Sequence, residues 1–142
     1  MALGRGELEF APLFADDELP FVAGAQGGHH VFVSFRVVNM DPKRMHVKVT
    51  TSVIEHPELD LTREGRVNFE ADTTGADGAA ESQAYTYAGW PAQILKAPCH
   101  PGERVQIHAT LTDLRMQVAN AEQTIRLATP DTPPPRECAE SP

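Results

Sequence analysis

The sequence predicts an all-β protein, built as a two-sheet antiparallel sandwich of about seven to eight strands. Apolar and polar residues alternate with a period of two in several segments, and turn signals separate these segments at intervals of roughly 10 residues. No stretch longer than a turn or two combines the helical period with helix caps, so we expect minimal helix. An antiparallel barrel, which the same alternation would also allow, is the alternative architecture.

The strongest strand pattern follows a glycine-containing entry and runs through residues 26–39. Side chains on one face of a strand recur every second residue, so the apolar positions of this stretch fall together. The opposite face is mixed, and it includes His30, Ser34 and Arg36. We therefore predict a central strand with one buried face and one partly solvated face. The residues predicted to face the core are Val31, Val33, Phe35 and Val37.

Residues 45–55 and 104–113 show the same two-faced pattern, which is typical of antiparallel sandwich strands. Turn signals that contain Pro42 and Pro57 flank the first segment, and a turn signal that contains Pro101 and Gly102 precedes the second. We predict that these two segments are core strands. The residues predicted to face inward are Met45, Val47, Val49, Thr51 and Val53 in the first segment and Val105, Ile107, Ala109 and Leu111 in the second.

The N-terminal segments are predicted to lie at a sheet edge. Residues 6–13 alternate apolar with acidic side chains but contain Pro12, which cannot donate a ladder hydrogen bond. Residues 16–18 are all acidic and predict a charged turn, and residues 19–23 predict a second short edge segment. Together these segments resemble a first strand that is split in two.

The remaining segments complete the predicted sheets. Residues 59–71 indicate two short strands or one bulged strand, with a turn at 63–66, and residues 72–82 predict an exposed loop. Residues 83–95 predict a strand bent near Gly89 and Pro91, with Trp90 as a plug in the core or at its rim. Residues 114–120 predict a turn and residues 121–127 a last strand.

Length and charge limit the function classes. A chain of 142 residues suits one domain, which we place at residues 1–128, followed by a proline-rich tail at 129–142. A formal net charge of -8 argues against nucleic acid or an anionic membrane surface as the partner. We expect no transmembrane segment, because no apolar run is long enough, and the given chain shows no export signal.

The two cysteines, Cys99 and Cys138, favour a disulfide that anchors the tail. The tail is too rich in proline to join a sheet, so another interaction must hold it. The bond would close a loop of roughly 40 residues, worth about 4 kcal/mol in the chain-entropy model, and it would imply an oxidising compartment. Two unrelated buried thiols, or one metal ligand and one bystander, are the alternatives.

Four features carry a family resemblance: the glycine-containing lead at residues 24–31, the Cys-x-x-Gly turn that starts at Cys99, the strand end at Asp113 and the final Cys138. Over about residues 19–138 the chain resembles uncharacterised bacterial exported domains, often lipoproteins, of immunoglobulin-like type. The resemblance implies an immunoglobulin-like or fibronectin-like sandwich and an extracytoplasmic location, in the periplasm, at the cell surface or secreted. It implies no established activity and no functional residue.

Histidines mark the ends of several predicted strands. His29 and His30 begin the central strand, His56 follows the next strand, which runs the opposite way, and His100 precedes a strand that runs the same way as the first. The strand order of an immunoglobulin-like sandwich places all three loops at one end. Imidazoles suit Zn or Cu, so these four histidines are a candidate metal site. Their spacing matches no compact metal motif, and solvated loop histidines are the alternative.

No catalytic motif is present in the sequence. The serines lack a nucleophile-elbow context, and the acidic clusters lack the interleaved spacing of a specific Ca²⁺ loop, so we do not predict an enzyme. Two hypotheses follow. The first is a noncatalytic exported domain that acts in protein–protein binding or as a structural, self-assembling module, with no cofactor. The second is a periplasmic Cu or Zn protein that uses the loop histidines.

Overall fold

The computed structural model describes residues 1–24, 28–72, 83–130 and 138. One sheet contains six strands: β1 (Ala2–Arg5), β2 (Ala11–Pro12), β4 (Val22–Ala23), β5 (His29–Val38), β8 (Glu70–Ala71) and β9 (Ala84–Gln93). The other contains five: β3 (Asp17–Leu19), β6 (Met45–Val53), β7 (Leu61–Val67), β10 (Arg104–Thr112) and β11 (Val118–Leu127).

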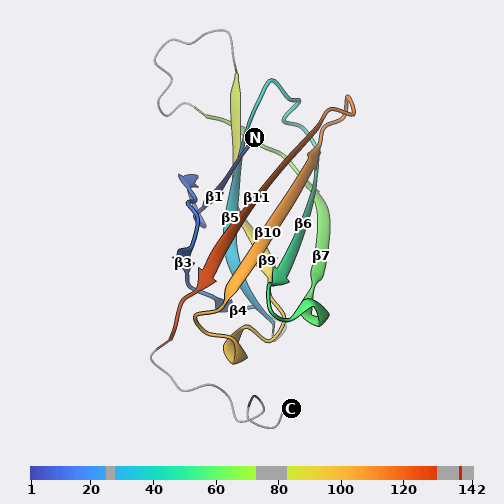
Figure 1. Cartoon of the computed structure of the whole chain (residues 1–142). Helices are drawn as coiled ribbons and strands as arrows, with labels where there is room; N and C mark the ends of the chain where they lie inside the picture. The colour runs from blue at the N-terminus through green and yellow to red at the C-terminus, as the bar shows by residue number, and fades with distance from the viewer. Residues whose placement is uncertain (25–27, 73–82, 131–137, 139–142) are drawn as a thin grey trace.

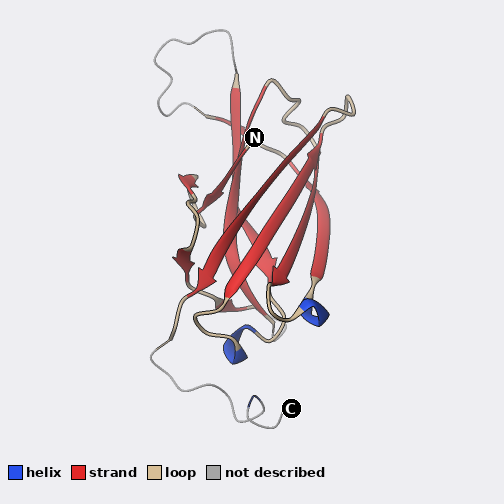
Figure 2. Ribbon diagram, viewed as in Figure 1, coloured by secondary structure: helices blue, strands red, loops and turns tan. Residues whose placement is uncertain are grey.

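The two sheets form the predicted sandwich rather than a barrel (Figure 1). The first sheet has the order β2-β1-β5-β9-β8, with β4 also paired to β5, and the second has the order β3-β11-β10-β6-β7. Two short 3-10 helices, η1 (Pro57–Leu59) and η2 (Ala97–Cys99), lie at the same end of the sandwich, and they are the coiled blue segments at the bottom of Figure 2. In the described part of the chain, no helical segment has the length and hydropathy needed to cross a membrane.

The core lies where the sequence predicted it. The four inward residues predicted for β5 are almost completely buried, as are those predicted for β6 and β10. Phe35 lies at the centre, with ring centroids 6.3 Å from Phe69 and 6.4 Å from Trp90. Trp90 is buried and closes one side of this cluster, which confirms its prediction as a plug. The period-two pattern was informative because β6 and β10 bury only one face. On β5 the predicted solvated face is wrong at Ser34, which is buried because its hydroxyl donates to the Arg5 carbonyl of β1 at 3.0 Å.

The bend predicted in β9 is also present. The register with β5 shifts between Val33 and Phe35, and Gly89 has a φ of 84°, which glycine adopts without strain. Pro91 is tolerated because β8 pairs with β9 only at Tyr85 and Thr86, so no strand of the described chain needs a donor from the outer side of Pro91.

The N-terminal prediction is partly wrong. The first strand, β1, lies at residues 2–5, ahead of the predicted segment, and it pairs antiparallel with β5. Of the predicted edge strand at 6–13, only Ala11–Pro12 forms a ladder. The four residues of β1 show no alternation, and they are held by tertiary packing: a Cβ at Gly4 would lie 2.4 Å from the ring of Phe10. Glycine permits this close approach.

The acidic segment at 16–18 is not simply a turn. Residues 17–19 form β3, which pairs parallel with β11, so the second sheet is mixed rather than wholly antiparallel. Leu19 is buried and anchors the strand, while the Asp17 carboxylate accepts the backbone N–H of Phe14 at 2.9 Å. Acidic side chains are compatible with a strand here because β3 lies at the edge of its sheet.

The turns predicted at residues 63–66 and 114–120 differ from those in the structure. Residues 63–66 belong to β7 and pair with β6, because Gly65 makes room for the ring of Trp90 rather than forming a turn. The chain then crosses to the other sheet, where β8 pairs with β9. The last strand begins at Val118, three residues earlier than predicted, since the Asp113 carboxylate closes the preceding turn by accepting the N–H groups of Arg115 and Gln117. The predicted loop at 72–82 and tail at 129–142 fall largely outside the described residues.

Candidate functional site

Two loops meet at the end of the sandwich that carries η1 and η2. The first follows β6 and carries His56, whose backbone N–H donates to the Val53 carbonyl at 2.8 Å. Pro57 then begins η1, which fixes the chain direction just after His56. The second loop joins β9 to β10, contains η2 and carries His100, whose backbone N–H donates to the Ala97 carbonyl at 3.0 Å. Each histidine therefore sits at a short helical turn rather than on a free loop.

The second loop also positions Glu103. Gly102 has a φ of 77°, a conformation that favours glycine, and its N–H donates to the Leu127 carbonyl at 2.8 Å. The Leu127 N–H in turn donates to the Glu103 carbonyl at 3.0 Å. The end of β11 thereby holds the backbone of Glu103, at the point where the chain enters β10.

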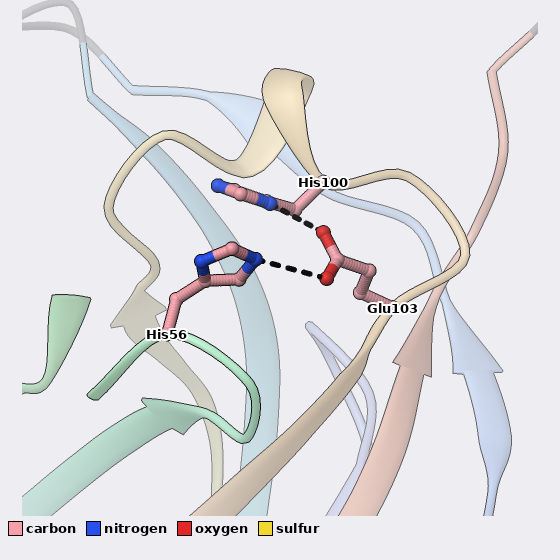
Figure 3. Close-up of side chains that lie close together, drawn as sticks. All are labelled: His56, His100 and Glu103. Carbon is pink, nitrogen blue, oxygen red and sulfur yellow. Dashed lines mark hydrogen bonds and ion pairs between the residues drawn. The ribbon is translucent and has the colours of Figure 1, made fainter. Parts of the chain in front are cut away.

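The side chains of His56, His100 and Glu103 converge (Figure 3). Nε2 of His56 lies 3.3 Å from Oε1 of Glu103, and Nδ1 of His100 donates a hydrogen bond to Oε2 of the same carboxylate. The two imidazole ring centroids are 4.5 Å apart. One donor atom from each of the three residues lies within 4.8 Å of the others. The exposed fractions of the side chains are 35% for His56, 14% for His100 and 30% for Glu103, so the cluster is shielded but reachable from solvent.

Glu58 contacts the other nitrogen of His56. Its Oε1 lies 3.4 Å from Nδ1 of His56, on the ring edge away from Glu103. A carboxylate at this nitrogen favours the tautomer that carries its proton on Nδ1, which leaves Nε2 free to bind a metal ion. Glu58 is therefore placed to orient the His56 ring.

The cluster matches the donor set of a transition metal. Two imidazoles and one carboxylate are a recognised ligand set for Zn²⁺ and leave a fourth position open. Imidazole nitrogens also suit Cu²⁺, whereas Ca²⁺ and Mg²⁺ prefer oxygen ligands only. In the arrangement described, the Glu103 carboxylate faces one nitrogen of each imidazole, and a metal ion between the three groups would replace the proton that His100 donates.

The predicted histidines separate into two groups. All four lie at this end of the sandwich. His56 and His100 are on the two loops, and His29 and His30 begin β5, where the backbone carbonyl of His29 accepts the N–H of Ile94, just before η2. The rings of His29 and His30 pack against Phe21 and Phe32, with centroid distances of 5.8 and 4.8 Å. The donor cluster found among the described residues contains neither of them.

Glu103 was not predicted as part of the site. It follows His100 by three residues across Pro101 and Gly102, and a Pro-Gly turn brings residues at this spacing together. That spacing is the signal that could have identified Glu103 from the sequence.

The predicted disulfide is confirmed. Cys99 is bonded to Cys138, with Cα atoms 5.3 Å apart and a sequence separation of 39 residues. Both cysteines are therefore in the disulfide, which excludes the two alternatives, free thiols and a cysteine metal ligand. Cys99 is the last residue of η2 and directly precedes His100.

The opposite end of the sandwich is apolar at its tip. Leu114 and Met116, in the turn between β10 and β11, and Val118, the first residue of β11, are 50%, 76% and 58% exposed. An open groove of about 450 Å³ lies beside this turn. The residues that line the groove are Asn39, Met40, Asp41, Pro42, Gln83, Tyr85 and Arg115.

Comparison with known proteins gives little guidance to function. No protein-family model and no curated protein matches the chain. A solved structure with some similarity is that of the CooA pilin subunit from enterotoxigenic Escherichia coli, which is 12% identical. That comparison covers 93% of this chain and 100% of the pilin subunit, with a TM-score of 0.42. A similarity of this size does not establish a shared family or function.

Proposed function

We propose that this protein is a noncatalytic, extracytoplasmic β-sandwich domain that binds a transition metal ion, Zn²⁺ or Cu²⁺, through His56, His100 and Glu103. The observation that carries the proposal is the convergence of three donor atoms, from two separate loops, within 4.8 Å of one another. The Cys99–Cys138 disulfide supports the extracytoplasmic location, since such bonds persist in oxidising compartments. Of the two hypotheses from the sequence, the metal-binding one has the more specific structural support.

The geometry sets the expected strength of binding. A three-ligand site leaves at least one coordination position to water, so binding is weaker than at closed four-ligand zinc sites. The ligands must also lose protons to bind the metal, so affinity falls as the pH is lowered. We expect a dissociation constant on the order of 1 μM at neutral pH, which corresponds to a binding free energy of about -8 kcal/mol.

Calorimetric titration with ZnCl₂ and CuCl₂ tests the proposal. The wild-type chain should bind one ion, and His100→Ala should weaken binding at least about tenfold through the loss of one ligand. His108→Ala is the matched control, because His108 is an exposed histidine on β10 outside the cluster. Equal binding by the wild type and His100→Ala would refute the proposed site.

A second candidate function is contact with a protein partner or with another copy of the chain. The exposed Leu114, Met116 and Val118 favour it, since large apolar side chains gathered on one turn are typical of interaction sites. Sedimentation velocity of the wild type against the triple variant Leu114→Ser, Met116→Ser, Val118→Ser tests self-association. If the wild type is monomeric over the micromolar range, self-association is excluded as the function of this surface.

We also propose the domain organisation expected from the sequence. Residues 1–128 form a single sandwich domain, and residues 129–142 form a proline-rich tail anchored by the disulfide. The disulfide at Cys138 supports the anchoring. Limited proteolysis under oxidising conditions should cleave within the tail and leave the sandwich intact. Cleavage within the sandwich before the tail would contradict this organisation.

A further inference from the structure

Two of the three metal donors lie on a single loop, and the disulfide is attached to that loop. Cys99 directly precedes His100, and Glu103 follows three residues later. The third donor, His56, belongs to a different loop, after β6. A bound metal ion would therefore tie this loop to the β6 side, while the disulfide ties the same loop to the chain beyond β11.

Apart from the disulfide, the centre of the loop is held mainly by bonds within itself. The N–H groups of Cys99, His100 and Glu103 donate to Lys96, Ala97 and His100 at 2.9, 3.0 and 3.2 Å. The bonds to the rest of the domain lie at its ends, where Ala97 is buried and where Gly102 and Glu103 pair with Leu127. Cys99, His100 and Pro101 are only partly buried. The disulfide is therefore the covalent restraint closest to a metal ligand.

We propose that the disulfide and the metal site are coupled, so that the oxidised chain binds the metal ion more tightly than the chain without the Cys99–Cys138 bond. This inference rests on the proposed function. The apparent dissociation constant of a site is inversely proportional to the fraction of molecules in the binding-competent arrangement. If the unlinked loop holds His100 in place between a third and a tenth of the time, the dissociation constant rises about three- to tenfold.

The coupling works in both directions. If the disulfide strengthens metal binding by a given factor, metal binding stabilises the disulfide by the same factor. The bond forms by exchange with a disulfide donor: both thiols lose their protons and together two electrons, and the donor leaves as two thiols. In a reducing compartment the chain would hold the metal weakly, and it would acquire its full affinity only where the disulfide can form.

The test compares Zn²⁺ affinity, by competition with a chromophoric chelator, in three forms of the full chain. These are the native oxidised protein, the double variant Cys99→Ser with Cys138→Ser, and native protein reduced with a phosphine and capped with methylthio groups. The capped form keeps the native sequence and guards against misfolding of the double variant, and circular dichroism checks all three. The control is Met40→Ala, which removes a buried side chain at the far end and lowers stability with the loop intact.

The expected result is binding about three- to tenfold weaker in both unlinked forms, with Met40→Ala equal to the native protein. If the native protein binds Zn²⁺ and both unlinked forms bind it equally well or more tightly, the coupling is wrong and the metal site is retained. Equal weakening in Met40→Ala would also overturn it, because the effect would then follow overall stability. A native protein that binds neither Zn²⁺ nor Cu²⁺ would overturn the proposed function and the coupling together.

Discussion

Asp113 offers the sharpest test of how the turn between β10 and β11 is held. Its side chain is fully buried, and its Oδ1 accepts the N–H groups of Arg115 at 2.9 Å and Gln117 at 2.8 Å. Its Oδ2 accepts the N–H of Asp41 at 3.0 Å and lies 3.7 Å from the guanidinium of Arg115. One carboxylate thereby joins the turn to the loop that follows β5.

The variant Asp113→Asn removes the charge while keeping the size of the side chain. The amide retains one oxygen, which can still accept from Arg115 and Gln117, but its NH₂ group then faces the N–H of Asp41. One hydrogen bond to a charged acceptor is worth about 1.5 to 3 kcal/mol, and a buried donor left unpaired adds to the loss. We expect Asp113→Asn to lower the free energy of unfolding by about 2 to 4 kcal/mol at pH 7.

The effect should depend on pH. Burial alone would raise the pKa of Asp113, but the hydrogen bonds from Asp41, Gln117 and Arg115 and the charge of Arg115 lower it, and the net pKa lies below its usual value. In the unfolded chain this carboxyl has an ordinary pKa of about 3.9. Between that pKa and the lower pKa of the folded state, the unfolded chain therefore binds more protons than the folded chain. The stability contributed by this carboxylate is present above about pH 4 and is lost as the pH falls through the lower, folded-state pKa.

Urea unfolding of the wild type and Asp113→Asn, measured between pH 7 and pH 2, provides the assay. The difference in the free energy of unfolding should be full at pH 5 to 7 and should shrink as the pH falls below about 4. Asp60→Asn is the control, because Asp60 is exposed and its replacement should change stability little. A difference that stays constant across this range would refute the reasoning.

Three further predictions concern the core, the bend in β9 and the metal site. Phe35→Ala should cost roughly 3 to 5 kcal/mol in urea unfolding, because it empties the centre of the core, and a loss under about 1 kcal/mol would contradict the packing. Gly89→Ala should cost about 1 to 3 kcal/mol, since its φ is 84° and its Cβ would lie 2.5 Å from the Glu7 carbonyl, and an unchanged unfolding midpoint would count against the bend. Glu58→Gln should weaken Zn²⁺ binding a few-fold in calorimetry with no change in stability, and unchanged affinity would remove its orienting role.

The long strands could be predicted because most of the buried residues of each strand share one face. Val47 and Val49 of β6 share a face in the sequence pattern and in the core alike. The strands of two to four residues could not be predicted in this way, since a segment such as Glu70–Ala71 is too short to show a period. Tertiary pairing creates these strands, and the sequence has no local signal for it.

The candidate site shows a similar division. Strand directions place the histidine loops at one end, which the sequence allowed us to predict. Whether His100 meets His56 or His29 depends on the conformation of the second loop, where Lys96 adopts a left-handed φ of 55°. It also depends on Phe21, whose ring packs against His29. Neither feature has a sequence signature, so the exclusion of His29 emerges only in three dimensions, whereas the spacing of His100 and Glu103 could have identified Glu103 from the sequence.

The parallel pairing of β3 with β11 has a consequence for synthesis of the protein. In the five-stranded sheet, β10 and β11 are interior strands, yet they are synthesised after every other strand of the described chain. Four fully buried residues of the core, Ile107, Leu111, Ile125 and Leu127, lie on these two strands. A nascent chain therefore cannot complete either its core or the pairing of β3 until β11 has been synthesised. Until then, β3 and the side of β6 that pairs with β10 remain unpaired sheet edges, so the sandwich can close only after these two strands have joined it.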